Sequence, residues 1–314
     1  MEIVIREMNL EEDLPNVLRL NNQYESVPID LQFFKQMLTA QKHSAVVKQV
    51  VLKRDKKMIG FAFVFSGSPL APTGFLVQRI VVDFQHQKQG IGRILESVLW
   101  NYIQVIKPKG LCTIVNETNP ESKKWAENYG FTELEMAFES VLDISSQTLS
   151  SMDYILRTNE EKGISFKTME DYPGEENFER ICELFRSLTK DVPVSYGRGA
   201  EIEKEMAASL LKSFEPENII LAVLDNRWVG ITLMNERVKN EEMYNFFTGT
   251  ITDMRGKGIA YALKLQAIKK CIPLGYKRMR TNNSSSNIPM LRVNEKLGFV
   301  RQPGKWILTK LLVW

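Results

Sequence analysis

Residues 87–93 of the chain read Gln-Lys-Gln-Gly-Ile-Gly-Arg, and residues 255–260 read Arg-Gly-Lys-Gly-Ile-Ala. Both segments fit the pattern Gln/Arg-x-x-Gly-x-Gly/Ala, and a Gly-Phe pair follows each of them, at 130–131 and at 298–299. The two glycine segments are 168 residues apart, and so are the two Gly-Phe pairs. A chance segment would not keep its distance from a second motif, so the pattern indicates a tandem duplication.

The composition is that of an ordinary globular protein. A length of 314 residues corresponds to about two domains of ~150 residues, and 44% of the residues are hydrophobic. The formal charge of +3 does not favour a nucleic-acid or membrane partner. Three widely spaced cysteines and an N-terminus without an apolar signal sequence indicate a cytoplasmic protein without a metal site. We expect a monomer or a homodimer.

Each half has the same predicted order of elements. A short strand comes first, followed by an amphipathic helix, a hairpin, a strand that runs into the glycine segment, a second amphipathic helix, another strand, a short helix and terminal strands. The strands that run into the glycine segments are 75–82 and 243–252, and the strands after the second helix are 111–116 and 277–282. This order predicts an α+β fold with two tandem domains, each a mixed, mostly antiparallel sheet flanked by helices in an α/β/α arrangement. We expect domains at 1–146 and 163–314, joined by a polar linker at 147–162.

The glycine segments have the chemistry of an anion site. A strand that leads through a glycine turn into a helix presents backbone N–H groups at the positive end of the helix dipole. Gly90 and Gly258 have no side chain, so a bulky anion can approach the backbone there. Basic residues surround both turns, namely Lys88, Arg93, Arg255 and Lys257. The segments therefore predict a pyrophosphate site in each half.

A Rossmann loop, a P-loop and a purely structural turn each fit these segments less well. A Rossmann loop has a third glycine, but Leu95 and Tyr261 stand at that position. A P-loop ends in Gly-Lys-Ser/Thr, which neither copy has. A purely structural turn would require neither the leading Gln or Arg nor the basic neighbours.

With these motifs in this order, the chain resembles the GCN5-related N-acetyltransferase (GNAT) superfamily, twice and over nearly its whole length. Residues 80–92 look like the principal acetyl-CoA segment of the family, and residues 248–260 and 290–299 are similar to bacterial tandem acetyltransferases of the mycothiol synthase type. The resemblance implies an N-acetyltransferase that moves an acetyl group from acetyl-CoA to a small-molecule or protein amine. It implies nothing about which amine.

The resemblance also implies a set of cofactor-binding residues. The loop amides would hold the pyrophosphate, and the pantetheine arm would pair with the backbone of 80–82 or 248–250. Asn119 and Asn287 fall where the family often has an asparagine on the cofactor, although capping of a helix explains each of them equally well. The full set is Ile80, Val82, Gln87, Lys88, Gln89, Gly90, Ile91, Gly92, Arg93 and Asn119 in the first half, and Thr248, Thr250, Arg255, Gly256, Lys257, Gly258, Ile259, Ala260 and Asn287 in the second.

The catalytic residues are harder to predict. Many family members have a tyrosine four residues before the glycine of Gly-Phe, which protonates the leaving thiolate, but Ala126 and Asn294 stand there. Another side chain or water must then protonate the leaving thiolate, or the thiolate must leave without being protonated. Glu242 and Tyr244 share one face of the second cofactor strand, and the first one, 75–82, has no carboxylate. We therefore expect catalysis in the C-terminal half, with Glu242 as base, although a solvated glutamate at a strand entry has the same pattern.

Two classes of function fit the sequence. One is acetyl transfer to an amine, and the other is binding or sensing of acyl-CoA by GNAT domains of which one or both are non-catalytic. His86, beside the first loop, is better explained as a surface or phosphate-side residue than as a base.

Overall fold

A computed structural model describes residues 2–25, 28–42, 44–68, 71–144, 153–194, 197–198 and 202–314. It divides into two compact units. Unit 1 consists of Met1–Met136 together with Pro303–Trp314, and unit 2 consists of Ala137–Gln302. Among the helices of the described residues, none is both long and apolar enough to cross a membrane.

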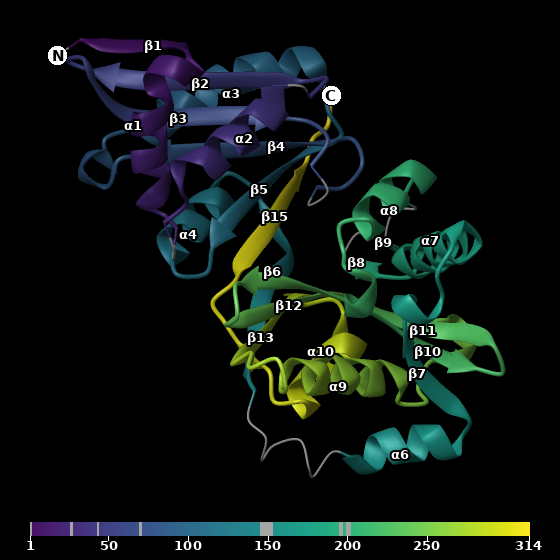
Figure 1. The fold of residues 1–314 in the computed structure, drawn as a ribbon. Coiled ribbons are helices and arrows are strands. Elements are labelled where there is room, and N and C mark those ends of the chain that lie inside the picture. The colour runs from purple at the N-terminus through teal and green to yellow at the C-terminus, as the bar shows by residue number, and fades with distance from the viewer. Residues whose placement is uncertain are drawn as a thin grey trace. The chain divides into compact units, whose positions relative to one another are not determined.

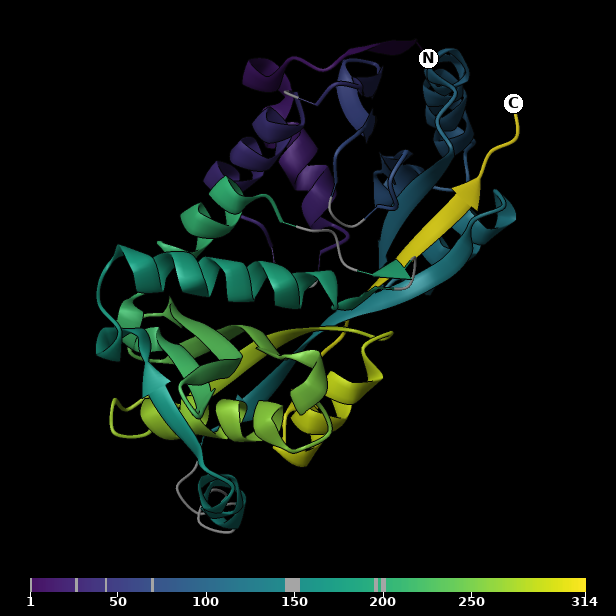
Figure 2. The same ribbon diagram turned by 90° about the vertical axis from the view of Figure 1, so that its right-hand side faces the viewer.

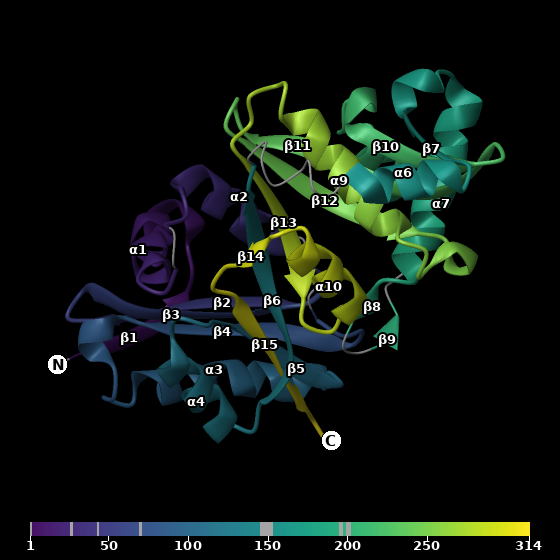
Figure 3. The same ribbon diagram turned by 90° about the horizontal axis from the view of Figure 1, so that it is seen from below.

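The sheet of unit 1 follows the predicted order of elements. Its strands lie in the order β1 (Ile3–Glu7), β2 (Val47–Arg54), β3 (Lys57–Phe65), β4 (Phe75–Val82), β5 (Gly110–Asn116) and β15 (Lys305–Leu311). The pair β4 and β5 is parallel, and the other neighbours whose register is given are antiparallel. Helices α1 (Leu10–Asn22) and α2 (Leu31–Lys42) cover one face, and α3 (Ile91–Ile106) and α4 (Pro120–Asn128) lie on the other (Figure 3).

Helix α3 forms because its apolar residues recur every four positions. Ile91, Leu95, Leu99 and Ile103 are each at most 1% exposed and make one stripe against the sheet. The helix begins directly after Gly90, which has a φ of 81°. The end of β4 and the start of α3 are thus joined by a turn that only glycine adopts readily.

Unit 2 repeats this arrangement. Its strands lie in the order β6 (Thr132–Asp143), β13 (Arg278–Ser284), β12 (Glu242–Thr250), β11 (Arg227–Val238), β10 (Ile219–Leu224) and β7 (Ile164–Thr168), with β14 (Val300–Arg301) beside β6. Helices α7 (Glu175–Lys190) and α8 (Lys204–Leu211) pack on one face. Helix α9 (Ile259–Cys271) lies on the other face with α10 (Ile288–Lys296) and α6 (Asp153–Glu161) (Figure 2, α7 in teal and α9 in yellow-green).

Several short elements complete the two units. Strands β8 (Pro193–Val194) and β9 (Gly197–Arg198) pair with each other. Short 3-10 turns precede the two long helices α3 and α9, at Phe84–His86 and Thr252–Met254. Two more lie at Met169–Asp171 and Pro216–Asn218.

The units exchange their last strands. Strand β15 comes from the end of the chain but pairs with β5 of unit 1, from Lys305 opposite Asn116 to Leu311 opposite Gly110 (Figure 1, yellow beside blue). In return, residues 137–143 of β6 pair with β13 of unit 2. The expected boundaries at 146 and 163 therefore differ from the observed units. The described part of the expected linker is also mostly helical, since it contains α6, which packs against α9 in unit 2. Residues 145–152, and with them the first part of that linker, lie outside the described residues.

The element order confirms the predicted fold class. Strands β1 to β5 correspond in turn to β7, β10, β11, β12 and β13, and the exchanged strand completes each sheet.

Candidate functional site

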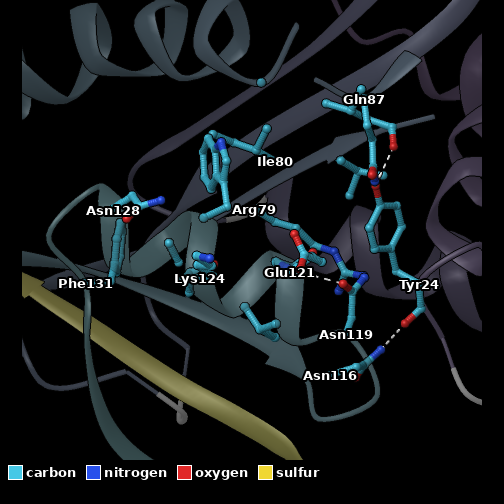
Figure 4. A pocket seen from close by; sticks show the side chains of 18 of the residues that line it. Tyr24, Arg79, Ile80, Gln87, Asn116, Asn119, Glu121, Lys124, Asn128 and Phe131 are labelled. Atoms are coloured by element: carbon cyan, nitrogen blue, oxygen red, sulfur yellow. Dashed lines mark hydrogen bonds between the residues drawn. The ribbon is translucent and has the colours of Figure 1, made fainter. Parts of the chain in front are cut away.

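The two parallel strands of unit 1 separate along their length. β4 and β5 pair only between Phe75–Val77 and Gly110–Cys112. Beyond that point the strands line a cavity of about 600 Å³, which reaches from residues 78–82 and 113–116 to the start of α3 (Figure 4). Its volume lies in the range of small-molecule and cofactor sites.

The loop at one end of this cavity is open. Gly90 precedes the first residue of α3 and no side chain caps the helix. A Cβ atom at Gly90 would meet no other atom within 4 Å. The N–H groups of the first turn of α3 are therefore accessible to an anion at the positive end of a 16-residue helix.

Most of the cofactor residues predicted in the first half line this cavity. They are Ile80, Val82, Gln87, Lys88, Gly90, Gly92, Arg93 and Asn119. Gln89 does not line it, because its Oε1 accepts a hydrogen bond from Arg54 Nη1 at 2.7 Å. Ile91 belongs to the hydrophobic core and is 1% exposed. Asn119 also caps α4, since its Oδ1 accepts from the backbone N–H of Ser122 at 3.3 Å.

A tyrosine connects the loop to the end of β4. Gln87 Nε2 donates to the hydroxyl of Tyr24 at 2.6 Å, and that hydroxyl donates to the carbonyl of Val82 (Figure 4). Burial raises the pKa of Tyr24, so the hydroxyl keeps its proton for this bond. The side chain of Gln87 thus fixes the loop against the strand.

Charged residues meet at the other side of the cavity. The carboxylate of Glu25, 6% exposed, accepts from Arg79 Nη2 at 2.9 Å and from Asn116 Nδ2 at 3.2 Å. Lys305 Nζ lies 3.3 Å from the same carboxylate. Burial raises the pKa of Glu25, but Arg79 and Lys305 outweigh this effect and the pKa is lowered. Glu25 is therefore an ionised partner of two cations.

The strands of unit 2 separate in the same way but enclose polar side chains. β12 and β13 pair only between Glu242–Asn245 and Arg278–Thr281. Next to this point, the amine of Lys264 on α9 lies 3.4 Å from Thr281 Oγ1, which donates to the carbonyl of Asn245. Thr248 Oγ1 donates to Asn245 Oδ1 at 3.1 Å. The predicted cofactor residue Thr248 is thus already hydrogen-bonded within the unit.

The second loop keeps the backbone geometry of the first. Gly256 and Gly258 have φ values of 75° and 83°. A Cβ at Gly258 would lie 4.0 Å from Nδ2 of Asn159 on α6, so the closest neighbour comes from the segment that was expected to be a linker.

The remaining predicted residues of unit 2 have contacts within the unit, although Arg255 and Lys257 are exposed. Arg255 donates from Nη2 to Asp191 at 2.7 Å and from Nε to the carbonyl of Thr250 at 3.3 Å. Lys257 Nζ lies 3.3 Å from the sulfur of Met254. Ile259 is buried in the core, Ala260 is half-buried, and Asn287 caps α10 through the N–H of Met290.

The expected catalytic pair of unit 2 lies in a cluster of arginines. Glu242 is 3% exposed and accepts from Nε and Nη2 of Arg280 at 3.0 and 3.1 Å. Burial raises the pKa of Glu242, but the hydrogen bonds and charges of the arginines outweigh this effect and lower it. Burial and Glu139 raise the pKa of Tyr244 to about 12. A carboxylate with a lowered pKa and a bidentate partner is a poor proton acceptor near neutral pH.

Sequence reasoning missed several residues that line or support the cavity of unit 1. Tyr24, Asn116 and Lys305 line it and come from a loop, the end of β5 and the exchanged strand, and Glu25 pairs with Arg79 and Lys305 from behind them. One signal was available. Arg79 stands in the largely apolar strand 75–82, and a cation buried among apolar residues needs a carboxylate partner.

In the sheet of each unit two parallel strands separate, and the first of these strands leads through a glycine turn into a helix. This arrangement is the GNAT fold, and it occurs twice in tandem. Residues 179–299 match the model of the Acetyltransferase (GNAT) family. The match supports acyl transfer from acetyl-CoA as the general activity. No curated protein matches the chain.

Solved structures share the fold over the whole chain. A GCN5-related N-acetyltransferase from Sphaerobacter thermophilus superposes with a TM-score of 0.69 at 14% identity, covering 98% of this chain and 95% of that one. A tandem GNAT protein from the clavulanic acid biosynthesis pathway gives 0.62 at 16% identity, covering 99% and 98%. At these identities the likeness shows the tandem fold alone.

Proposed function

We propose that the protein transfers an acetyl group from acetyl-CoA to an amine, and that unit 1 holds the cofactor and carries out the transfer. The observation that carries this proposal is the cavity between β4 and β5, which joins the open helix start at Gly90 to the gap between the two strands. Acetyl-CoA would supply the activated acetyl group.

The residues of unit 1 fit such a ligand. The N–H groups at the start of α3 would bind the pyrophosphate, with Lys88 and Arg93 adding positive charge. Ile80 and Val82 lie on the strand edge that faces the gap, where the backbone can pair with an extended amide-bearing chain. Ala126, at the position of the family's tyrosine, offers no proton to a leaving thiolate.

Unit 2 is the second candidate for the transfer, because the family match lies within it. The geometry of unit 2 supports catalysis there less well. The predicted base Glu242 is held by Arg280, and the side chains at the point of strand separation hydrogen-bond to one another. A protein that binds acyl-CoA without turnover is the remaining alternative.

Calorimetric titration of the full chain with CoA tests the proposal, together with an assay of acetyl-CoA-dependent thiol release over a panel of amines. We expect one CoA bound per chain and thiol release that depends on the amine. Absence of binding at millimolar CoA would rule out the cofactor assignment. Binding without release for any amine would leave the non-catalytic alternative.

A further inference from the structure

The segment Tyr24–Glu25 crosses the gap between the separated strands of unit 1. At one end the Tyr24 hydroxyl donates to Val82 of β4, and at the other the Tyr24 carbonyl accepts from Asn116 of β5. Glu25 then accepts from Arg79 of β4 and lies beside Lys305 of β15. Arg79 and Lys305 both line the cavity, on the same side as this segment.

Positive charge exceeds negative charge in this cavity. Five Lys and Arg side chains line it, together with one carboxylate, that of the exposed Glu121 (Arg79, Lys88, Arg93, Lys124, Lys305). Lys88 and Arg93 lie at the loop, where a phosphate would be bound. Arg79 and Lys305 lie away from the loop and share the single carboxylate of Glu25, so one net positive charge remains there.

We propose that the acceptor is an amine that carries a carboxylate, of the amino-acid class, and that Arg79 and Lys305 bind this carboxylate. The inference rests on the proposed function, since it concerns the second substrate of the same cavity. A guanidinium held in place by Glu25 can offer its other N–H donors to a planar carboxylate. A polyamine, in contrast, would bring more positive charge to a site that already has an excess.

The same pairing would help the chemistry. In a free amino acid the carboxylate stabilises the ammonium form of the amine, and pairing of that carboxylate with Arg79 and Lys305 weakens this stabilisation and lowers the pKa of the amine. The bound acceptor would therefore lose its proton more readily, which reduces the need for a strong base. Glu25 cannot supply such a base itself, because its pKa is lowered.

The test compares matched acceptors on the intact protein. Thiol release is measured with an α-amino acid, the carboxamide of the same amino acid, and spermidine. We expect kcat/KM to be roughly tenfold to a hundredfold higher for the free acid than for the carboxamide, the range of one charge-assisted hydrogen bond. Arg79→Gln should remove this preference, whereas Lys310→Gln, on the same strand as Lys305 but outside the cavity, should keep it.

A binding measurement keeps the inference testable if Arg79→Gln does not fold. The CoA-loaded wild-type protein is titrated with the N-acetylated amino acid and with its neutral amide. The inference is supported if the acid binds more tightly than the amide and if added salt weakens the binding of the acid. Equal binding of both, or turnover of spermidine at the rate of the amino acid, overturns it and leaves the proposed function intact. Failure of CoA to bind would overturn both.

Discussion

The two units keep the same gap between parallel strands but differ in the side chains at corresponding positions along it. In unit 1, Ile80, Val82, Val115, Ala126 and Phe131 are apolar and lie among the polar and charged residues that also line the cavity. At the positions 168 residues later, unit 2 has Thr248, Thr250, Asn283, Asn294 and Phe299. The apolar side chains at these positions of unit 1 form no hydrogen bonds with the backbone, so they leave the strand edges available to a ligand. The polar side chains of unit 2 already bond to one another, so a ligand would have to replace those bonds.

The helices that follow the two glycine loops also differ, because the helix of unit 2 is more deeply buried than that of unit 1. Helix α3 buries one stripe, whereas α9 is buried on several faces, because α6 packs against it as well. Lys264 of α9 is 1% exposed, and the corresponding residue of α3 is the half-buried Glu96. Duplication has thus preserved the fold while the helix after the second loop became more deeply enclosed, and this difference, together with the cavity between β4 and β5, is why we propose unit 1 as the cofactor site.

The strand exchange gives the largest expected effect. Deletion of residues 303–314 removes β15, whose Ile307 and Leu308 are fully buried in unit 1. Loss of two buried side chains costs about 3–6 kcal/mol, and β5 loses a neighbour along its whole length. We expect CoA binding to disappear in calorimetry, while limited proteolysis still yields a protected fragment of unit 2. A truncated chain that binds CoA as the full chain does would contradict the observed exchange.

The two glycine turns allow a matched comparison of the units. Gly90→Trp places a large side chain where the structure has open space, and we expect it to weaken CoA binding roughly 100-fold or more, equivalent to about 2.8 kcal/mol. Gly258→Trp should leave CoA binding and turnover largely unchanged. Gly67→Trp is the control, because Gly67 has a φ of 83° and equally open surroundings outside the cavity. The reverse result, with turnover lost only in Gly258→Trp, would assign the chemistry to unit 2.

The sequence could predict the fold because the decisive signals are local. The glycine turns and the apolar stripe of α3 each depend on neighbouring residues, and both appear in the structure; the 168-residue offset compares two such local signals. The exchange of β6 and β15 could not be predicted, because alternating strands do not reveal which sheet they join. The cluster of Glu25, Arg79 and Lys305 depends on that exchange. The arginine partners of Glu242 likewise could not be predicted, because they come from the neighbouring strands β11 and β13.

Glu242→Gln tests whether this carboxylate has a structural or a catalytic role. Its loss removes the buried anion common to Arg280, Arg237 and Arg278, although Glu139 still pairs with Arg237 and Arg280 and Glu241 with Arg278, and we expect unit 2 to lose about 2–3 kcal/mol of stability in urea unfolding. The folded pKa of Glu242 is lowered, so this contribution is present above the ordinary pKa of ~4.3 and is lost as the pH falls through the folded value. Turnover should change little. A fall of ~100-fold with unchanged stability would instead support Glu242 as a general base.

Lys264→Met tests the buried amine of unit 2 and has the smallest expected effect. Burial lowers the pKa of Lys264 to about 7, and among the described residues no carboxylate lies within ion-pair distance of its amine. The unfolded lysine keeps its proton up to pH ~10.4, so between these values the unfolded state binds more protons and wild-type stability rises with pH. The substitution removes this cost, and we expect a gain on the order of 2 kcal/mol at pH 6 that shrinks towards pH 10. Urea unfolding of both proteins at pH 6, 8 and 9.5 measures the difference, with Lys269→Met, on the same helix, as control. A difference that does not vary with pH, or a loss of stability at pH 6, would show that the amine has an anionic partner and that the gap in unit 2 accepts charge after all.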